Sequence, residues 1–421
     1  MNWIGSAEML KTSIFASQFM ESAFCACRFK TVVVKKLVIV GISLIGFSAQ
    51  AKVSDGGNTV PTALIFNGKL QSIESRMRDY DIPGVSIALI QNRQISWVAN
   101  FGWKDIATQQ EVTSDTLFQV ASISKPVTAV AALKLVEEGK LNLNTPANEY
   151  LQSWQIPKNE HNAASPVLVK QLLNHTAGLT VSGFAGYEVG KPIPSITEVL
   201  EGASLFGRLL GQNNANSPSV EVAKTPGTDF AYSGGGYSVL QQLLVDKEHT
   251  DFTHLMQQKV LSPLGMQQST FQQPIDNVRA DFVATGYMEN NKPVAGHYHV
   301  YPEQAAAGLW TTASDLAKFA IDIQNALHDD SGVVLSQASA KTMTSPTINQ
   351  AVGLGVFLMG ANIDGQGYFM HDGWNKGFSS TMLAHKSEGY GVIILTNANK
   401  PNFNKELVIG LMLEYGWLIT S

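Results

Sequence analysis

Apolar residues follow one another in short runs near both ends of the chain, and these runs predict β-strands. Val85 to Ile90 and Ile95 to Phe101 are two such runs, separated by Gln91-Asn92-Arg93. A polar break of this length between two apolar runs is typical of a β-hairpin. Near the other end, Tyr390 to Thr396 (YGVIILT) has the pattern of a strand buried on both faces. The pattern therefore predicts strands from widely separated parts of the chain.

Between these runs the apolar residues recur every three or four positions, which is the spacing of an α-helix. Leu70, Ile73 and Met77 predict a first helix, stopped by Asp81-Ile82-Pro83-Gly84. The same spacing predicts helices at about 122–138, 314–327 and 406–415. The apolar face of the second of these comprises Leu316, Phe319, Ala320 and Ile323.

The order of these elements predicts an α+β, multi-layer fold. Residues 140–285 are mostly helical in pattern, with long loops at 182–194 and 211–228. Strands near both ends with helices between them favour an antiparallel β-sheet flanked by helices, not a repeated βαβ unit. We expect one domain over 52–421. Its sheet part covers about 65–120 and 286–421, with a mostly helical insertion at about 121–285.

The first 51 residues have the composition of a targeting segment. Lys35-Lys36 precede an apolar run from Leu37 to Phe47, and Ala49-Gln50-Ala51 follows it. This order predicts a signal peptide cut after Ala51, and so a periplasmic or secreted protein. The apolar run is shorter than the about 20 residues that span a bilayer, so we expect no stable membrane span. An uncleaved membrane anchor is the alternative.

Composition narrows the possible chemistry. Hydrophobic residues make up 44% of the chain and charged residues 15%, with a formal net charge of −5. This excludes a disordered protein, and without a Lys/Arg-rich run we expect no nucleic-acid partner. The two cysteines, Cys25 and Cys27, both precede the predicted cut. A mature chain without cysteine has no disulfide, zinc–thiolate site or cysteine nucleophile.

One tetrad, Ser122-Ile123-Ser124-Lys125, is the only S-x-x-K in the chain. On a helix, Ser122 and Lys125 share one face, so the lysine is placed to take the serine proton. Pro126 is tolerated only in the first helical turn, which puts Ser122 where backbone N–H groups are free. About one such tetrad is expected by chance in a chain of this length, so the motif alone also fits an ordinary helix start. The chain has no H-E-x-x-H and no glycine-rich phosphate loop, and we expect no metal or organic cofactor.

The surroundings of this tetrad are similar to a known superfamily. The similarity lies in six segments in the same order: 118–126 (FQVASISKP), 172–179 (LLNHTAGL), 226–237 (PGTDFAYSGGGY), 261–266 (LSPLGM), 308–316 (GLWTTASDL) and 371–378 (HDGWNKGF). Over about residues 65–415 the chain resembles the serine β-lactamase and penicillin-binding protein superfamily. The matching branch holds class C β-lactamases, D-alanyl-D-alanine carboxypeptidases, D-aminopeptidases and β-lactamase-like esterases.

The resemblance implies roles for further residues. Tyr232 corresponds to the phenol that shares proton transfer with Lys125, and we expect the neighbouring ammonium to lower its pKa. Gly234 stands where the family usually has an asparagine that binds a substrate amide. This departure weakens the expectation of β-lactam or peptide recognition more than that of catalysis.

A second departure lies at His371-Asp372-Gly373, which replaces the usual Lys-Thr-Gly strand. The resemblance implies that His371 donates a hydrogen bond to a substrate carboxylate or to Tyr232. Gly373 would allow the substrate to approach the strand closely. The backbone N–H of Trp374 would be the second donor to the oxyanion. We assign no role to Asp372.

Four other polar residues are expected to be structural. They are His175 (a capping histidine), Asp315 (a charge in the first turn of a helix), and His297 and His299 (a solvated loop).

Together these features predict a serine hydrolase that cleaves an ester or amide through a Ser122 acyl-enzyme, like the family's esterases or D-amino-acid peptidases. Its expected substrate is a small molecule or a fragment derived from peptidoglycan. One alternative is a β-lactamase or D-alanyl-D-alanine carboxypeptidase, and another is a penicillin-sensing protein with weak catalysis.

Overall fold

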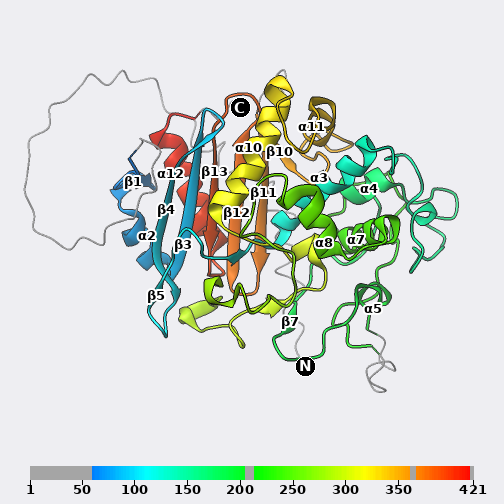
Figure 1. Cartoon of the computed structure of the whole chain (residues 1–421), viewed down its shortest axis with the longest axis horizontal. Helices are drawn as coiled ribbons and strands as arrows, with labels where there is room; N and C mark the ends of the chain where they lie inside the picture. The colour runs from blue at the N-terminus through cyan, green and yellow to red at the C-terminus, as the bar shows by residue number, and fades with distance from the viewer. Residues whose placement is uncertain (1–58, 204–212, 361–366, 418–421) are drawn as a thin grey trace, which may run out of the picture. The chain divides into compact units, whose positions relative to one another are not determined.

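A computed structural model describes residues 59–203, 213–360 and 367–417 (Figure 1). The predicted leader and its cut lie outside the described residues, as do the first two positions of the loop at 211–228. The largest sheet has seven strands, each antiparallel to its neighbours, in the order β10-β11-β12-β13-β3-β4-β5. Their bounds are β3 Gly84–Gln91, β4 Gln94–Asp105, β5 Gln110–Glu111, β10 Phe357–Met359, β11 Tyr368–Asn375, β12 Phe378–His385 and β13 Gly391–Thr396.

The predicted hairpin is confirmed as β3 and β4. Its two turn residues, Asn92 and Arg93, have φ values of 51° and 59°. Two successive left-handed residues form the turn whose twist matches that of paired strands. Strand β13 pairs with β3, and this joins the C-terminal part of the chain to the N-terminal part in one sheet.

The first predicted helix is shorter than expected. Helix α2 spans Ile73–Tyr80, capped at its start by the Ser72 side chain. Leu70 lies instead in β2 (Lys69–Gln71), which pairs with β1 (Leu64–Phe66), and its side chain is 72% exposed. Three apolar residues at helical spacing were therefore too few to place the helix start, which the capping serine sets.

Helices cover both faces of the large sheet. Helix α10 (Ala313–Asp329) packs on β3, β4, β12 and β13 with the predicted apolar face, and crosses in front of the sheet in Figure 1. Helix α12 (Pro401–Glu414) packs on β12, β1 and α2. Every residue of β12 and β13 is buried, as expected for strands with a helix layer on each side.

The remaining helices gather beside the β11 end of the sheet (Figure 1). They are α3 Ser124–Glu137, α4 Val169–Leu173, α5 Ile196–Glu201, α7 Gly234–Glu248, α8 Phe252–Met256, α9 Gln304–Ala307 and α11 Gln337–Met343. Short strand pairs tie this region together: β6 (Phe118–Gln119) pairs with β9 (Trp310–Thr311), and β7 (Tyr187–Glu188) pairs with β8 (His299–Val300). The predicted α+β class with an antiparallel sheet and a helical region is confirmed.

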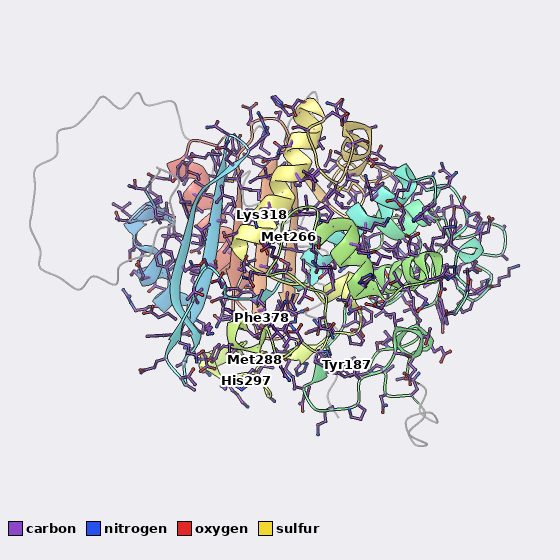
Figure 2. All side chains as sticks on the ribbon, viewed as in Figure 1. Tyr187, Met266, Met288, His297, Lys318 and Phe378 are labelled. Carbon is purple, nitrogen blue, oxygen red and sulfur yellow. The ribbon has the colours of Figure 1, made fainter. Side chains whose placement is uncertain are left out.

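Side-chain contacts connect the elements to one another, and several of the residues involved are labelled in Figure 2. Lys318 of α10 donates a hydrogen bond to the Gly265 carbonyl, next to Met266. Phe378, at the start of β12, is fully buried with its ring centroid 5.7 Å from that of Trp310. In the part of the chain that the structure describes, no helix is both long and apolar enough to cross a membrane.

Candidate active site

Ser122 lies in a tight turn where the large sheet meets the helical region. This turn is a short 3₁₀ helix, η1 (Ala121–Ile123), and it leads directly into α3. Ala121 has a φ of 48°, a left-handed conformation that a non-glycine residue adopts at a cost in free energy. The Ser124 hydroxyl holds the turn because it donates to the Ala121 carbonyl (2.6 Å) and accepts from the Leu309 N–H (2.9 Å). The half-buried Ser122 side chain is thus presented on a rigid support.

Lys125 is buried beneath this serine. Its Nζ atom lies 3.0 Å from Ser122 Oγ and donates a hydrogen bond to the Ala306 carbonyl at 2.8 Å. The lysine is 2% exposed, and burial lowers its pKa to about 7. Pro126 follows in the first turn of α3, as the sequence predicted. With this pKa a substantial fraction of the lysine is neutral at physiological pH, and the neutral amine can accept the serine proton.

Tyr232 comes from the segment just before α7, and its hydroxyl shares a hydrogen bond with Ser122. Lys125 Nζ lies 4.9 Å from the centroid of the tyrosine ring. Burial raises the pKa of the Tyr232 phenol, and the bond with Ser122 opposes this only in part. The expectation that Lys125 lowers this pKa was therefore wrong in direction. Tyr232 remains a protonated phenol that can donate to an oxygen.

His175 packs behind Tyr232 and is more than a cap. The two ring centroids are 4.4 Å apart, and His175 Nδ1 accepts a hydrogen bond from the Ser233 N–H at 3.2 Å. Burial, together with Lys125 and His371, keeps the pKa of His175 well below its ordinary value. The neutral imidazole fixes both the ring and the backbone at the start of α7.

His371 is brought to the site by β11, with its ring 6.3 Å from that of Tyr232. The side chain is buried, and burial with a contribution from Lys125 lowers its pKa to about 3. Its Nδ1 lies 2.6 Å from the Asp372 carbonyl, which only accepts hydrogen bonds. Nδ1 therefore carries the proton of the neutral ring, and Nε2 is an acceptor. Through Nε2, His371 cannot make the donor contact that the sequence led us to expect.

Gly373 and Trp374 lie where β11 runs past the Ser122 turn. Strand β10 pairs with β11 only at Tyr368–Met370, so the later part of β11 packs on η1 instead. A Cβ atom on Gly373 would be 2.0 Å from the Val120 carbonyl oxygen, which explains the glycine. Trp374 projects to the surface and is 41% exposed. The role of its N–H as an oxyanion donor stays a prediction.

Comparison with known proteins shows to which protein family the chain belongs. The Beta-lactamase family model matches residues 71–416. The chain belongs to the beta-lactamase family. It is 26% identical over 341 residues to Protein flp of Staphylococcus aureus (strain MW2), covering 78% of this chain but only 62% of that relative. It is also 26% identical to a Beta-lactamase of Pseudomonas fluorescens, covering 79% of this chain and 93% of the relative.

Solved structures share the fold of this beta-lactamase-family chain. An octameric penicillin-binding protein homologue from Pyrococcus abyssi superposes with a TM-score of 0.65 at 24% identity, covering 81% of this chain and 76% of that one. The D-alanine carboxypeptidase AmpC of Burkholderia cenocepacia gives a TM-score of 0.61 at 24% identity, covering 82% and 97%. At this identity the similarity concerns the fold alone.

The structure adds site residues that the sequence did not reveal. The Ala306 carbonyl contacts Lys125, and the Phe357 ring lies beside both Tyr232 and His371. A backbone carbonyl has no sequence signal, and Phe357 looks like any core residue of a short strand. Both reach the site only through tertiary packing.

Three residues that were expected to be structural, Asp315, His297 and His299, make none of the contacts described above around Ser122. Asp315 accepts hydrogen bonds from the Gln268 N–H and from Ser269 and Lys318, so its role is structural. His297 lies at the surface (Figure 2), whereas His299 is buried in β8 and not in a solvated loop. Among the described residues, no three His, Cys, Asp or Glu side chains gather as a metal site.

Proposed function

We propose that this beta-lactamase-family protein is a serine hydrolase that cleaves esters through a Ser122 acyl-enzyme. The observation that carries the proposal is the 3.0 Å approach of Lys125 Nζ to Ser122 Oγ in a buried setting. A serine hydroxyl is a weak nucleophile until a neighbouring base takes its proton. A buried lysine with a pKa of about 7 meets this need.

Acylation follows from these contacts. Neutral Lys125 takes the proton of the Ser122 hydroxyl as Oγ bonds to the carbonyl carbon of the substrate. The backbone N–H groups of Ser122 and Trp374 are the proposed donors to the resulting oxyanion. When the bond to the leaving oxygen breaks, Tyr232 gives that oxygen its proton and regains one from the Lys125 ammonium.

Deacylation runs through the same groups in reverse. A water molecule loses a proton to neutral Lys125 as its oxygen bonds to the acyl carbon. The bond between that carbon and Ser122 Oγ then breaks, and Oγ regains a proton through Tyr232 and Lys125. The products are a free acid and an alcohol, and every group of the site returns to its starting state.

Two observations favour an ester over a substrate that carries a carboxylate. His371 presents an acceptor nitrogen where a Lys-Thr-Gly strand would place a cation, so the site lacks that charge for a substrate carboxylate. Gly234 has no side chain to bind a substrate amide. A neutral ester requires neither contact. A D-amino-acid amide is the second substrate class, because it also lacks a carboxylate, although it would lack a side-chain contact from position 234.

The alternatives predicted from the sequence remain candidates. A relative named Beta-lactamase supports β-lactam hydrolysis, and D-alanyl peptide hydrolysis is an activity that the shared fold accommodates in a D-alanine carboxypeptidase. A protein that only senses penicillin would acylate without turnover. Because the chain spans 62% of the length of the curated relatives that it matches first, their whole activity is not carried over.

A substrate panel separates these functions. Purified protein is assayed on p-nitrophenyl acetate, D-alanine p-nitroanilide, muropeptides and a chromogenic cephalosporin, and is labelled with a fluorophosphonate probe, beside Ser122→Ala. We expect ester turnover and Ser122-dependent labelling. Faster cephalosporin turnover than ester turnover would favour the β-lactamase, and absence of both turnover and labelling would refute the hydrolase.

The proposed location is the periplasm or the medium, after removal of residues 1–51. N-terminal sequencing of protein recovered from the periplasm and medium of an expressing bacterium tests it. A mature start at Lys52 supports the proposal, and retention of full-length protein in the membrane fraction contradicts it.

A further inference from the structure

The Tyr232 ring is bordered by two phenylalanine rings that the proposed catalysis does not use. Phe357, in β10, lies at the centre of this group: its ring centroid is 5.2 Å from that of His371, 6.1 Å from Tyr232 and 6.4 Å from Phe230. The rings of Phe357 and Tyr232 are stacked, with 19° between their planes. We call Phe230, Tyr232 and Phe357 the aromatic wall.

The wall is positioned to meet a ligand and not only to fill the core. Each of its three residues is partly exposed, and the Tyr232 hydroxyl shares a hydrogen bond with Ser122. Phe357 contacts both of the other rings, and partly exposed rings in contact form an apolar surface of the kind that lines ligand pockets. The two imidazoles next to it, His175 and His371, are neutral, because burial lowers the pKa of both. An apolar group can lie against this surface without stripping water from a charged imidazole.

A fourth ring lies next to Gly234. A Cβ atom built on that glycine would be 3.0 Å from Phe184 Cε2 and 3.2 Å from the Ser182 carbonyl oxygen. The Gly234 N–H donates to this same carbonyl at 3.2 Å, so the loop is held against the start of α7. A side chain at position 234 would therefore crowd Phe184 and the Ser182 carbonyl. The start of α7 thus has an aromatic ring beside it and no polar side chain at Gly234.

We propose that the aromatic wall binds an apolar, ring-sized group on the alcohol side of the ester. The inference rests on the proposed function, in which Tyr232 protonates the leaving oxygen. Since Phe357 stacks on Tyr232, a group attached to that oxygen lies within reach of the wall. The substrate class is then the ester of an aryl-alkyl or cyclic alcohol with a small acid.

Two pairs of esters test which side of the substrate is recognised. Ethyl acetate and 2-phenylethyl acetate differ in the alcohol, whereas ethyl acetate and ethyl 3-phenylpropanoate differ in the acid. Their reacting centres are of similar chemical reactivity. We expect kcat/KM to be at least about tenfold higher for 2-phenylethyl acetate than for ethyl acetate, because apolar groups in a fitted pocket discriminate by this order. The acid-side pair should differ by less than about threefold.

Variants connect the preference to the wall. Phe357→Leu, which keeps an apolar side chain in β10, should bring the alcohol-side ratio to within about threefold of unity, whatever its effect on the absolute rate with ethyl acetate. Phe282→Ala is the matched control, because Phe282 is a 38% exposed phenylalanine outside the wall, and it should leave the ratio unchanged. Labelling of Ser122 by a fluorophosphonate verifies that each variant is folded.

The outcomes distinguish this inference from the function on which it rests. Equal rates for both alcohols, a larger preference on the acid side, or an alcohol preference that Phe357→Leu leaves intact would each overturn the aromatic-wall proposal while ester hydrolysis stands. If no ester is hydrolysed and Ser122 is not labelled, the proposed function itself fails.

Discussion

The imidazole of His175 packs against the Tyr232 ring with 37° between their planes, and its Nδ1 accepts a hydrogen bond from the N–H of Ser233, the residue after the tyrosine. One side chain therefore fixes both the ring and the backbone of the tyrosine that contacts Ser122. His175 touches no reacting atom, so it acts as a positioning residue for the proposed proton transfer.

This relationship predicts a selective loss in rate. His175→Ala should lower kcat for p-nitrophenyl acetate by about tenfold or more with KM changed less than about threefold, because proton transfer depends on the placement of Tyr232. His175→Phe retains a ring behind Tyr232 and should recover part of kcat. A parallel rise in KM, or unchanged kcat in His175→Ala, would contradict the positioning role.

The buried lysine predicts the pH dependence of ester hydrolysis. The base works only when deprotonated, and burial lowers the pKa of Lys125 to about 7. Hence kcat/KM should rise about tenfold per pH unit below pH 7 and level off above it. A midpoint near 7 also resembles an ordinary histidine, but the pKa of His371 is held at about 3.

His371→Asn separates the two explanations. The midpoint of the pH profile should stay within about half a unit of 7 in this variant if Lys125 is the titrating base. If kcat/KM of His371→Asn no longer rises with pH below pH 7, the titration belongs to the histidine instead.

A side chain at position 373 is predicted to destabilise the protein where β11 packs on η1. In Gly373→Ala the new methyl carbon would lie 2.0 Å from the Val120 carbonyl oxygen and 2.4 Å from Ser380 Oγ. Strand β11 must therefore move away from η1, the turn that carries Ser122. We expect a loss of about 1–3 kcal/mol in the free energy of unfolding, and a loss of most ester hydrolysis.

Gly236→Ala is the matched control for this substitution. A Cβ atom at Gly236, in α7, meets nothing closer than 3.6 Å, and alanine favours a helix. Its melting temperature should equal or exceed that of the wild type, with activity retained. Equal effects of the two substitutions would show that crowding at β11 is not the cause.

Glu303, which precedes α9, predicts a pH-dependent stability. The side chain is fully buried and neither carboxyl oxygen has a hydrogen-bond partner among the described residues. Burial raises the pKa of Glu303 to about 8. The folded protein thus binds a proton that the unfolded chain has lost between about pH 4.5 and pH 8, so the free energy of unfolding falls as pH rises through this window.

Glu303→Gln removes this titration. The variant should melt a few degrees above the wild type at pH 9, and the difference should shrink toward pH 5. Glu149→Gln, at an exposed position, is the control and should leave the melting temperature unchanged at both pH 9 and pH 5. A difference in melting temperature that does not vary with pH would rule out titration of Glu303 as its source.

Local signals predicted much of the fold. The β3–β4 hairpin, the apolar face of α10 and strand β13 each follow from a periodicity confined to a few neighbouring residues. The start of α2 was misplaced because Leu70, although apolar, faces solvent in a short edge strand. The periodicity shows which side chains are apolar, but it does not show which of them are buried against other elements.

The sequence by itself predicted that Ser122 lies beside Lys125, because residues three apart share a face of a helical turn, and this holds although Ser122 lies in η1 and Lys125 in α3. It also supplied Tyr232, His371 and Gly373 through resemblance to the beta-lactamase family. Only the tertiary structure decided their chemistry. Burial lowers the pKa of Lys125 and raises that of the Tyr232 phenol, as the proposed proton transfer requires, and the Asp372 carbonyl turns His371 Nε2 into an acceptor. Desolvation and hydrogen-bond direction depend on groups that are distant in the chain or fixed by the fold, so no local pattern of residues contains them.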